Sequence, residues 1–364
     1  MHDVIIVGSG VAGGYLAQKL EGLDVLVVEK SKDASLKDSG IVSSRFFDFV
    51  RVGRLVEHEI TEMRAVAPSG NSFYLRSEKP FAYLLDRLEL SRFLMKGAAR
   101  SAEMAFEMVK DVEYFKSHVH VTTNEGSYDA RMVVGADGAL SKVRKSMGIS
   151  PPGKMYAGMF VRSQEPVGEG VDVFFNKYYS PDFFSWTIGQ NREYGLITSI
   201  RPAEYLDYFR GHQGLPEGTL RSYLVPAGFT RSYGDRALLV GESCGQVKPI
   251  SGGGIVFSLV AARHAARVIR EAFANDRFDA RMLGNYERLW RGELSWEIRL
   301  QLLVRNAYRW LTNKDIEKLF RDFGPRIEDA RGFDYDHLSG IVSGLPKWKL
   351  MQHAVANVPY VLRG

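Results

Sequence analysis

The sequence contains one cysteine in 364 residues, so the chain has no internal disulfide. Such scarce cysteine is typical of a reducing compartment. No apolar run approaches the roughly 20 residues that a membrane-spanning helix needs. No basic segment followed by an apolar segment stands before the first strand-like run, as it would in a signal peptide. We therefore expect a cytoplasmic protein that does not cross a membrane.

Sequence motifs for nucleic acids and for metal ions are also lacking. No segment has the form of a known nucleic-acid-binding module. His118 and His120 share one face of a predicted strand, but neither has an evident acidic or cysteine partner. Metal centres are usually built from several such ligands. We expect no metal site and no nucleic-acid partner.

The charge of the chain is modest and unevenly placed. The formal net charge is +5, and 45% hydrophobic with 25% charged residues is typical of a soluble globular protein. Residues 281–364 carry 14 Lys and Arg against 10 Asp and Glu, a difference of +4. Three interpretations of this basic region stay open: a solvated surface, a peripheral contact with the inner face of an anionic membrane, or a surface for an acidic partner protein.

The length of the chain exceeds what one hydrophobic core usually serves, so more than one structural part is expected. Buried-strand runs and helical segments predict a discontinuous α/β domain made of residues 1–50, 87–147 and 226–280. Short alternating and aromatic runs predict a mostly antiparallel substrate domain made of residues 51–86 and 148–225. Helical spacing dominates beyond Tyr286, and residues 281–364 are predicted to form a helical C-terminal region. The predicted fold is a Rossmann-type domain with an inserted antiparallel sheet and a helical C-terminal region.

The first functional signal is the glycine turn Gly8-Ser-Gly10-Val-Ala-Gly13, between an apolar run and a helical segment. Gly8 would permit the tight turn, Gly10 the approach of a pyrophosphate, and Gly13 close packing of helix on strand. The N-terminus of the helix would then face the phosphates. Glu29 ends the next apolar run and would accept hydrogen bonds from the adenosine ribose. This pattern predicts a dinucleotide site.

Two later clusters favour FAD over NAD as the nucleotide. Val133-Val-Gly-Ala-Asp137-Gly138 and the residues after it resemble the G-A-D-G-x-x-S-x-V-R segment of flavoproteins of the p-hydroxybenzoate hydroxylase type. Gly241-Glu242-Ser-Cys-Gly245 stands where those proteins carry G-D-A-A-G, whose acid binds FAD. The resemblance implies FAD as cofactor. No second dinucleotide fingerprint is present, so electrons would come from transiently bound NAD(P)H or from a ferredoxin-like protein.

Within that superfamily the chain resembles the geranylgeranyl reductases. Val247-Lys-Pro-Ile-Ser-Gly-Gly-Gly-Ile255 is similar to their P-x-T/S-G-G-G-I run, and the segments 181–188 and 82–87 are similar to their Y-x-W-x-F-P and R-x-x-F-D segments. The chain departs from the family in three places. Asp38 stands where many members have a loop cysteine, Glu242 replaces an aspartate, and Gly189 replaces a proline.

The resemblance implies a set of FAD contacts along the chain. They fall on the glycine turn, on the loop near residue 40, on one helix start, and on the later glycine run. The implied residues are Gly8, Gly10, Ala12, Gly13, Glu29, Asp38, Ser39, Ile41, Arg87, Val109, Asp137, Glu242, Gly253, Gly254 and Ile255. Backbone N–H groups at the last two, Gly254 and Ile255, would face the flavin ring and favour its reduced, anionic form.

The implied activity is FAD-dependent saturation of carbon-carbon double bonds in geranylgeranyl or other isoprenoid chains of lipids. Phe184 and Trp186, two residues apart on one predicted strand, would share a face of the substrate cavity. Plain core packing of the two rings is the alternative. The proton donor is not identified, and Asp38 and Lys248 are the candidates.

Other functions stay open on the sequence alone. One is a FAD-dependent monooxygenase or halogenase of the same superfamily, and another is a flavin-binding paralogue without enzyme activity. The segment 241–245 also spells G-x-S-x-G, the nucleophile elbow of serine hydrolases, which would make Ser243 the nucleophile. That interpretation leaves the N-terminal glycine turn unexplained. Cys244 in the same segment is expected to be a small buried thiol.

Overall fold

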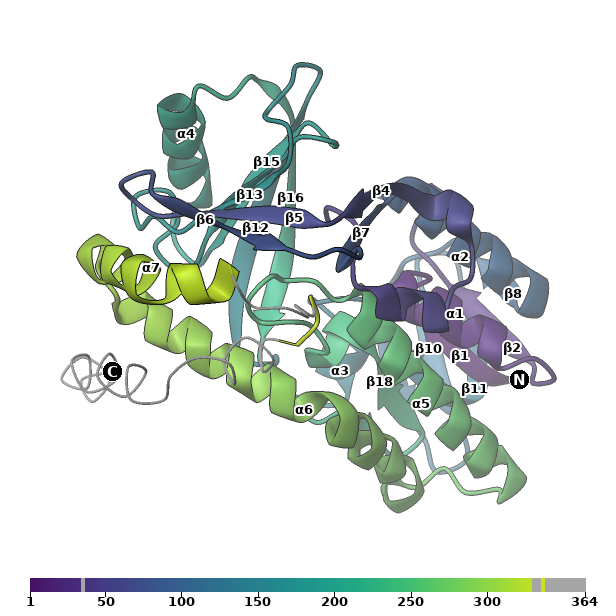
Figure 1. Cartoon of the computed structure of the whole chain (residues 1–364). Coiled ribbons are helices and arrows are strands. Elements are labelled where there is room, and N and C mark those ends of the chain that lie inside the picture. Colours follow the sequence, from purple (N-terminus) through teal and green to yellow (C-terminus); the bar gives the residue numbers. More distant parts are fainter. Residues whose placement is uncertain (34–36, 329–334, 338–364) are drawn as a thin grey trace.

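The fold is organised by an eight-stranded sheet, a seven-stranded sheet and a three-stranded sheet (Figure 1). The computed structural model describes residues 1–33, 37–328 and 335–337. The predicted helical region 281–364 therefore lies partly outside the described residues. Within them, the α/β and antiparallel parts and the helical C-terminal region are all present, so the predicted fold class is confirmed.

The eight-stranded sheet has a parallel centre in which β1 (His2–Val7) lies between β11 (Ser127–Gly135) and β2 (Val25–Val28). The four residues of β2 and the last four of β1 are all buried, as expected for central strands covered on both faces. The remaining strands are β8 (Glu103–Ala105), β9 (Val109–Tyr114), β10 (Val119–Thr123), β17 (Tyr233–Gly234) and β18 (Ala237–Leu239).

Three helices pack together on the same side of this sheet in Figure 1: α1 (Val11–Lys19), α2 (Arg87–Ser101) and α5 (Ile255–Ala274). The Asp86 carboxylate begins α2 by accepting hydrogen bonds from the backbone N–H groups of Leu88 and Glu89 at 3.0 and 2.9 Å. The helix α2 thus begins at Arg87, directly after its capping residue. The short helix α3 (Lys142–Ser146) follows β11, and the 3-10 helix η3 (Gly241–Cys244) follows β18.

The seven-stranded sheet is antiparallel except where β13 runs parallel to β5. Its strands are β5 (Glu62–Val66), β6 (Ser72–Arg76), β12 (Lys154–Ser163), β13 (Val171–Phe174), β14 (Ser185–Ile188), β15 (Glu193–Thr198) and β16 (Gly218–Ala227). The helix α4 (Pro202–Gln213) interrupts the segment 148–225, which was predicted to be mostly antiparallel sheet. The aromatic residues of this segment suggested a strand, but Leu206 and Phe209 are buried on one face of a helix instead.

A small sheet joins the two larger ones along the chain. It contains β3 (Ile41–Val42), β4 (Val56–Ile60) and β7 (Ala82–Leu85), with the 3-10 helices η1 (Ser44–Asp48) and η2 (Gly53–Leu55) between the first two strands. β3 follows the loop that contains Asp38 and Ser39. Its pairing with β7 brings the loop before residue 41 close to the start of α2.

The long helix α6 (Ala280–Trp310) passes from the first sheet to the second and is followed by α7 (Asn313–Glu328) (Figure 1). Leu283, Trp290 and Ile298 of α6 are fully buried in the core that contains α1 and α5. Near the other end, Tyr308 packs against Phe183 beside β14. The side chain of Asp279 caps α6 through the N–H of Met282, so the helix begins before residue 286, where its spacing becomes clear in the sequence.

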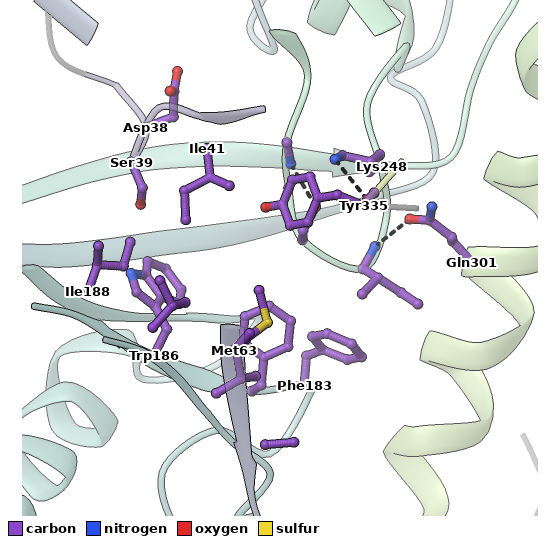
Figure 2. A pocket seen from close by; sticks show the side chains of 18 of the residues that line it. Asp38, Ser39, Ile41, Met63, Phe183, Trp186, Ile188, Lys248, Gln301 and Tyr335 are labelled. Atoms are coloured by element: carbon purple, nitrogen blue, oxygen red, sulfur yellow. Dashed lines mark hydrogen bonds between the residues drawn. The ribbon is translucent and has the colours of Figure 1, made fainter. Parts of the chain in front are cut away.

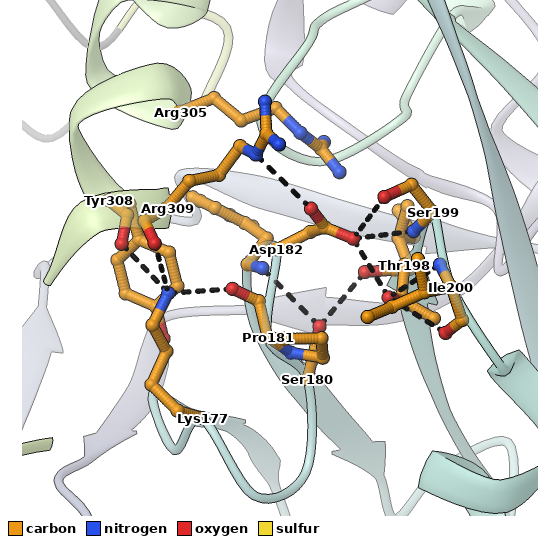
Figure 3. A network of polar contacts seen from close by, with 12 residues as sticks. Lys177, Ser180, Pro181, Asp182, Thr198, Ser199, Ile200, Arg305, Tyr308 and Arg309 are labelled. Carbon is orange, nitrogen blue, oxygen red and sulfur yellow. Dashed lines mark hydrogen bonds and ion pairs between the residues drawn. The ribbon is translucent and has the colours of Figure 1, made fainter. Parts of the chain in front are cut away.

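A polar network fastens the end of α6 to the second sheet (Figure 3). The ammonium of Lys177 donates hydrogen bonds to the backbone oxygens of Pro181 and Tyr308 at 2.6 and 2.8 Å. Burial lowers the pKa of Lys177 to about 8. The Asp182 carboxylate accepts from the Thr198 hydroxyl at 2.8 Å and pairs with Arg309 at 3.4 Å. The network holds α6 in place as one wall of the cavity described below.

Candidate functional site

The turn between β1 and α1 is built from three glycines with different surroundings. Gly8 has φ +96°, and a side chain there would lie 2.5 Å from the Ala136 oxygen. A Cβ on Gly13 would lie 1.9 Å from the Gly8 oxygen, so α1 packs directly on the turn. A Cβ on Gly10 would meet nothing within 4 Å. The start of α1 therefore leaves open space on the Gly10 side.

A cavity of about 270 Å³ lies in front of this turn, and we call it the polar cavity. Many of the residues expected at a FAD site line it: Gly8, Gly10, Ala12, Glu29, Asp38, Arg87, Val109, Asp137, Glu242, Gly254 and Ile255. Gly13 packs behind the turn. Ser39, Ile41 and Gly253 line a second cavity instead. The structure thus brings together residues from four strand ends and from the starts of three helices, α1, α2 and α5.

The carboxylates of the polar cavity leave oxygen atoms available for a hydroxyl-rich ligand. Glu29 accepts two hydrogen bonds from Ser9 on Oε2, at 2.7 and 3.0 Å. Asp137 accepts from the Lys142 N–H on Oδ2 at 2.6 Å, whereas its buried Oδ1 has no partner. Burial raises the pKa of Asp137 and of Glu242. An orphaned acceptor beside a bare helix start fits the ribose, ribityl and phosphate groups of a dinucleotide.

Asp38 and Arg87 form an ion pair at the end of the polar cavity. The Arg87 Nε lies 3.0 and 2.9 Å from the two oxygens of Asp38, and its Nη1 donates to Ser91 at 2.7 Å. The Arg87 side chain is only 6% exposed, whereas that of Asp38 is 30% exposed. Both Asp38 oxygens are therefore held as acceptors.

The second cavity, which we call the apolar cavity, has a volume of about 370 Å³ (Figure 2). Phe184 and Trp186 both line it, with ring centroids 6.1 Å apart at 75°. Other apolar lining residues are Ile41, Met63, Ala65, Phe73, Leu75, Val171, Val173, Phe175, Phe183, Ile188, Ile250, Val304 and Ile327. Asp38, Tyr223, Gly252, Gly254 and Ile255 line both cavities, so the two meet at the start of α5.

Lys248 lies in the wall of the apolar cavity, but its charge is already paired. Its ammonium is 2.9 Å from Asp336 Oδ1 and lies 3.9 Å over the ring of Tyr335. Asp336 is fully buried and also accepts from the Ser43 hydroxyl. These contacts make Lys248 an anchor for residues 335–337, which close one side of the cavity.

The amino-acid sequence matches the FAD binding domain family over residues 1–204. The chain belongs to this family. FAD is accordingly its cofactor, and the orphaned acceptors and open glycine turn of the polar cavity fit that molecule. We propose that the lining residues named above make the individual FAD contacts.

Proteins similar to this chain include archaeal reductases and flavoenzymes of known structure. This FAD-binding chain is 28% identical to digeranylgeranylglycerophospholipid reductase 2 of Methanothermobacter thermautotrophicus, over 88% of this chain and 91% of the relative. A geranylgeranyl bacteriochlorophyll reductase-like protein of Thermoplasma acidophilum has a TM-score of 0.84 at 21% identity, covering 94% and 95% of the two chains. A flavin-dependent brominase has a TM-score of 0.69 at 16% identity, covering 90% and 93%. The resemblance to geranylgeranyl reductases is confirmed.

The serine hydrolase interpretation of this FAD-binding protein is wrong. Ser243 is fully buried, and its hydroxyl donates to the backbone oxygens of Gly135 and Val240 at 2.8 and 2.9 Å. The Nε2 of His264 on α5 lies 2.7 Å from the carboxylate of Glu293 on α6, so this histidine pairs with Glu293 and not with Ser243. The next residue, Cys244, is a buried free thiol whose pKa is raised by burial. The segment 241–245 is a turn that presents Glu242 to the polar cavity.

The structure corrects one detail of the histidine pair. Asp129 on the neighbouring strand β11 lies 2.7 Å from His120 and 3.9 Å from His118. Asp129 is not adjacent to the two histidines in the sequence. The antiparallel pairing of β10 with β11 brings it beside them. Within the described ranges no group of three or more potential ligands gathers.

Sequence reasoning missed residues that the fold brings to the cavities from distant segments. Tyr223 on β16 stands where the cavities meet, and Tyr335 comes from the C-terminal region. Glu193, the first residue of β15, is fully buried behind the apolar cavity. None of them stands in a motif. The one feature of the sequence that could have pointed to Glu193 is a charged residue within a segment of aromatic strands.

Proposed function

We propose that this chain is a FAD-dependent reductase that saturates carbon-carbon double bonds in geranylgeranyl or related isoprenoid chains of lipids. The observation that carries the proposal is the aromatic, largely apolar cavity that opens directly onto the polar cavity at the start of α5. An isoprenoid chain is apolar along its length and suits such a wall. The names of its relatives support this substrate class.

In this proposal the chain binds and orients both reactants. Reduced FAD, when bound, supplies the hydride for one alkene carbon. Glu29, Asp137 and Glu242 would hold the hydroxyl groups of the cofactor. The start of α5 has no side-chain cap at Gly254, so its N–H groups would stabilise negative charge at the ring. Phe184 and Trp186 would align the alkene and exclude water.

The test is anaerobic incubation of prenyl lipids with the FAD-loaded, dithionite-reduced protein, followed by mass spectrometry. We expect a gain of two mass units for each double bond reduced. A monooxygenase or halogenase would instead require oxygen and add an oxygen or halogen atom. Absence of any two-unit gain across geranylgeranyl lipids and free geranylgeranyl alcohols would overturn the proposal and favour a paralogue without activity.

The natural electron donor can be assigned in the same assay. The polar cavity is the site proposed for FAD, and the sequence carries one dinucleotide fingerprint. We propose that the donor binds transiently, either as NAD(P)H or as a ferredoxin-like protein. Replacing dithionite by each donor under anaerobic conditions, and following bleaching of the flavin absorbance, distinguishes the two.

We also propose that the outer face of α6 contacts an anionic lipid surface. Trp296, Leu303 and Trp310 are exposed on this face by 72%, 66% and 39%, and Arg299 is exposed beside them. Trp, Leu and Arg on one helix face are typical of interfacial helices. The opposite face of the same helix lines the apolar cavity with Gln301, Val304 and Tyr308. A lipid substrate would thus be taken up next to the membrane. Among the described residues, no helix is long and apolar enough to span one.

Vesicle sedimentation tests this contact. The wild-type protein should sediment with phosphatidylglycerol vesicles more than with phosphatidylcholine vesicles, and Trp296→Ser with Leu303→Ser should lower that binding several-fold. Phe115→Ser, at an exposed ring outside α6, is the matched control and should bind as the wild type does. Equal binding by all three proteins would show that α6 is not the contact.

A further inference from the structure

Glu193 is a fully buried carboxylate, and packing alone does not explain why a charged residue stands at this position. It begins β15, and both oxygens are engaged. Oε1 accepts from the Trp186 indole N–H at 3.2 Å and from the Ser39 hydroxyl, and Oε2 accepts from Arg162 Nε at 3.2 Å. Burying a carboxylate away from water costs free energy unless hydrogen bonds or an opposite charge compensate for the lost hydration.

The partners of Glu193 connect it to the apolar cavity. Ser39 and Trp186 both line the cavity, and Figure 2 shows Ser39 above the Trp186 indole on one side of it. Gly195 leaves room for the indole, since a Cβ there would lie 2.6 Å from Trp186 Cζ2. On the other side, the Arg162 side chain is 31% exposed. Glu193 thus lies between the cavity and the surface.

We propose that Ser39 is the catalytic proton donor of the reaction and that Glu193 acts through it as a proton reservoir. The inference rests on the proposed function. The alkene carbon that does not receive the hydride takes the Ser39 hydroxyl proton, so an O–H bond breaks and a C–H bond forms. This step needs the protonated form of Glu193, in which the hydrogen bond is reversed: the carboxyl group donates to Ser39 Oγ, and its proton passes to that oxygen as Ser39 gives up its own. The resulting Glu193 carboxylate regains a proton from solvent before the next turnover.

The other polar groups of the cavity are less suited to donate. Asp38 is paired with Arg87 through both oxygens and its side chain is 30% exposed, whereas Glu193 is fully buried. Lys248 is paired with Asp336. The hydroxyl of Tyr223 is buried where the cavities meet, and burial raises its pKa. Ser39 is the cavity hydroxyl that is joined to a buried carboxyl group.

The groups around Glu193 set the direction of its pH dependence. Burial raises the pKa of Glu193, while the Ser39 hydrogen bond, the Arg162 charge and the Trp186 hydrogen bond oppose that rise. Tyr223 on β16 also faces it and is neutral. The protonated form is present below the folded pKa and is lost as pH rises through it. Proton delivery should therefore slow as pH increases.

Single-turnover reduction of a prenyl lipid by the FAD-loaded protein tests the relay. Glu193→Gln and Ser39→Ala should each slow the reaction by at least about 100-fold without changing FAD content, and the double variant should be no slower than Ser39→Ala. Glu193→Gln should also lose the pH dependence. Ser39→Thr keeps the hydroxyl and should recover most of the rate. Ser117→Ala, which removes an exposed serine hydroxyl that lines neither cavity, is the control and should react normally.

A readout without turnover comes from Trp186. In the apoprotein its fluorescence should change as Glu193 titrates, because the indole donates to that carboxylate. Glu193→Gln should abolish the change, and Ser39→Ala should move its midpoint to higher pH. Absence of a Glu193-dependent titration, or wild-type turnover in both Glu193→Gln and Ser39→Ala, would overturn the relay alone. Failure of the wild-type reaction would overturn the proposed function and the relay with it.

Discussion

Gly13→Ala should lower the free energy of unfolding by about 3 kcal/mol and prevent FAD retention. The added Cβ would lie 1.9 Å from the Gly8 oxygen and 3.1 Å from the Ala136 Cβ. Both neighbours belong to the strand ends that hold the turn, so α1 must move away from the sheet. The measurements are denaturant unfolding of the apoprotein and the flavin absorbance left after gel filtration of the FAD-loaded protein.

Gly10→Ala is the matched control on the same turn. Its Cβ would meet nothing within 4 Å, and the backbone at Gly10 is extended with φ −62°. The apoprotein should unfold within about 0.5 kcal/mol of the wild type. FAD should nevertheless bind much more weakly, because the methyl group occupies the space in front of α1. Normal FAD retention by Gly10→Ala would place the pyrophosphate elsewhere.

The parts of the fold that sequence predicts well are those with local causes. The buried runs of β1 and β2 with the turn between them predict a β-α-β unit, and Asp86 marks the start of α2. The helix α4 was missed because its aromatic residues have the same composition as the strands around it. Composition cannot choose between a strand and a helix when both bury one face against the same sheet.

The candidate site shows the same division between local and distant causes. The acids of the polar cavity follow strand ends, and the carboxyl ends of parallel strands meet at one edge of a sheet. Ser39 and Glu193 are 154 positions apart and meet only because the loop before β3 packs against the second sheet. Asp336 reaches Lys248 across 88 positions. Contacts between such distant residues depend on how the sheets pack together, and a short sequence motif does not predict that packing.

Ala65→Phe should abolish reduction of a geranylgeranyl chain, with a loss of at least about 100-fold, while FAD binding stays intact. Ala65 lines the apolar cavity and lies across the sheet from Phe73 and Val173, which line it too. A phenyl ring at this position would occupy part of the about 370 Å³ in which the chain must lie. The readouts are single-turnover mass spectrometry, flavin content and melting temperature.

Two comparisons make the result specific to the cavity. Arg64→Phe places the same ring on the opposite face of β5, where Arg64 pairs with Asp172, and should cost at most about 1 kcal/mol with normal turnover. A shorter prenyl substrate should lose less activity than a geranylgeranyl chain in Ala65→Phe, because it needs less of the blocked volume. Equal losses for both substrates would mean that the ring disturbs the flavin side of the site. Unchanged activity would mean that the isoprenoid chain lies outside the apolar cavity.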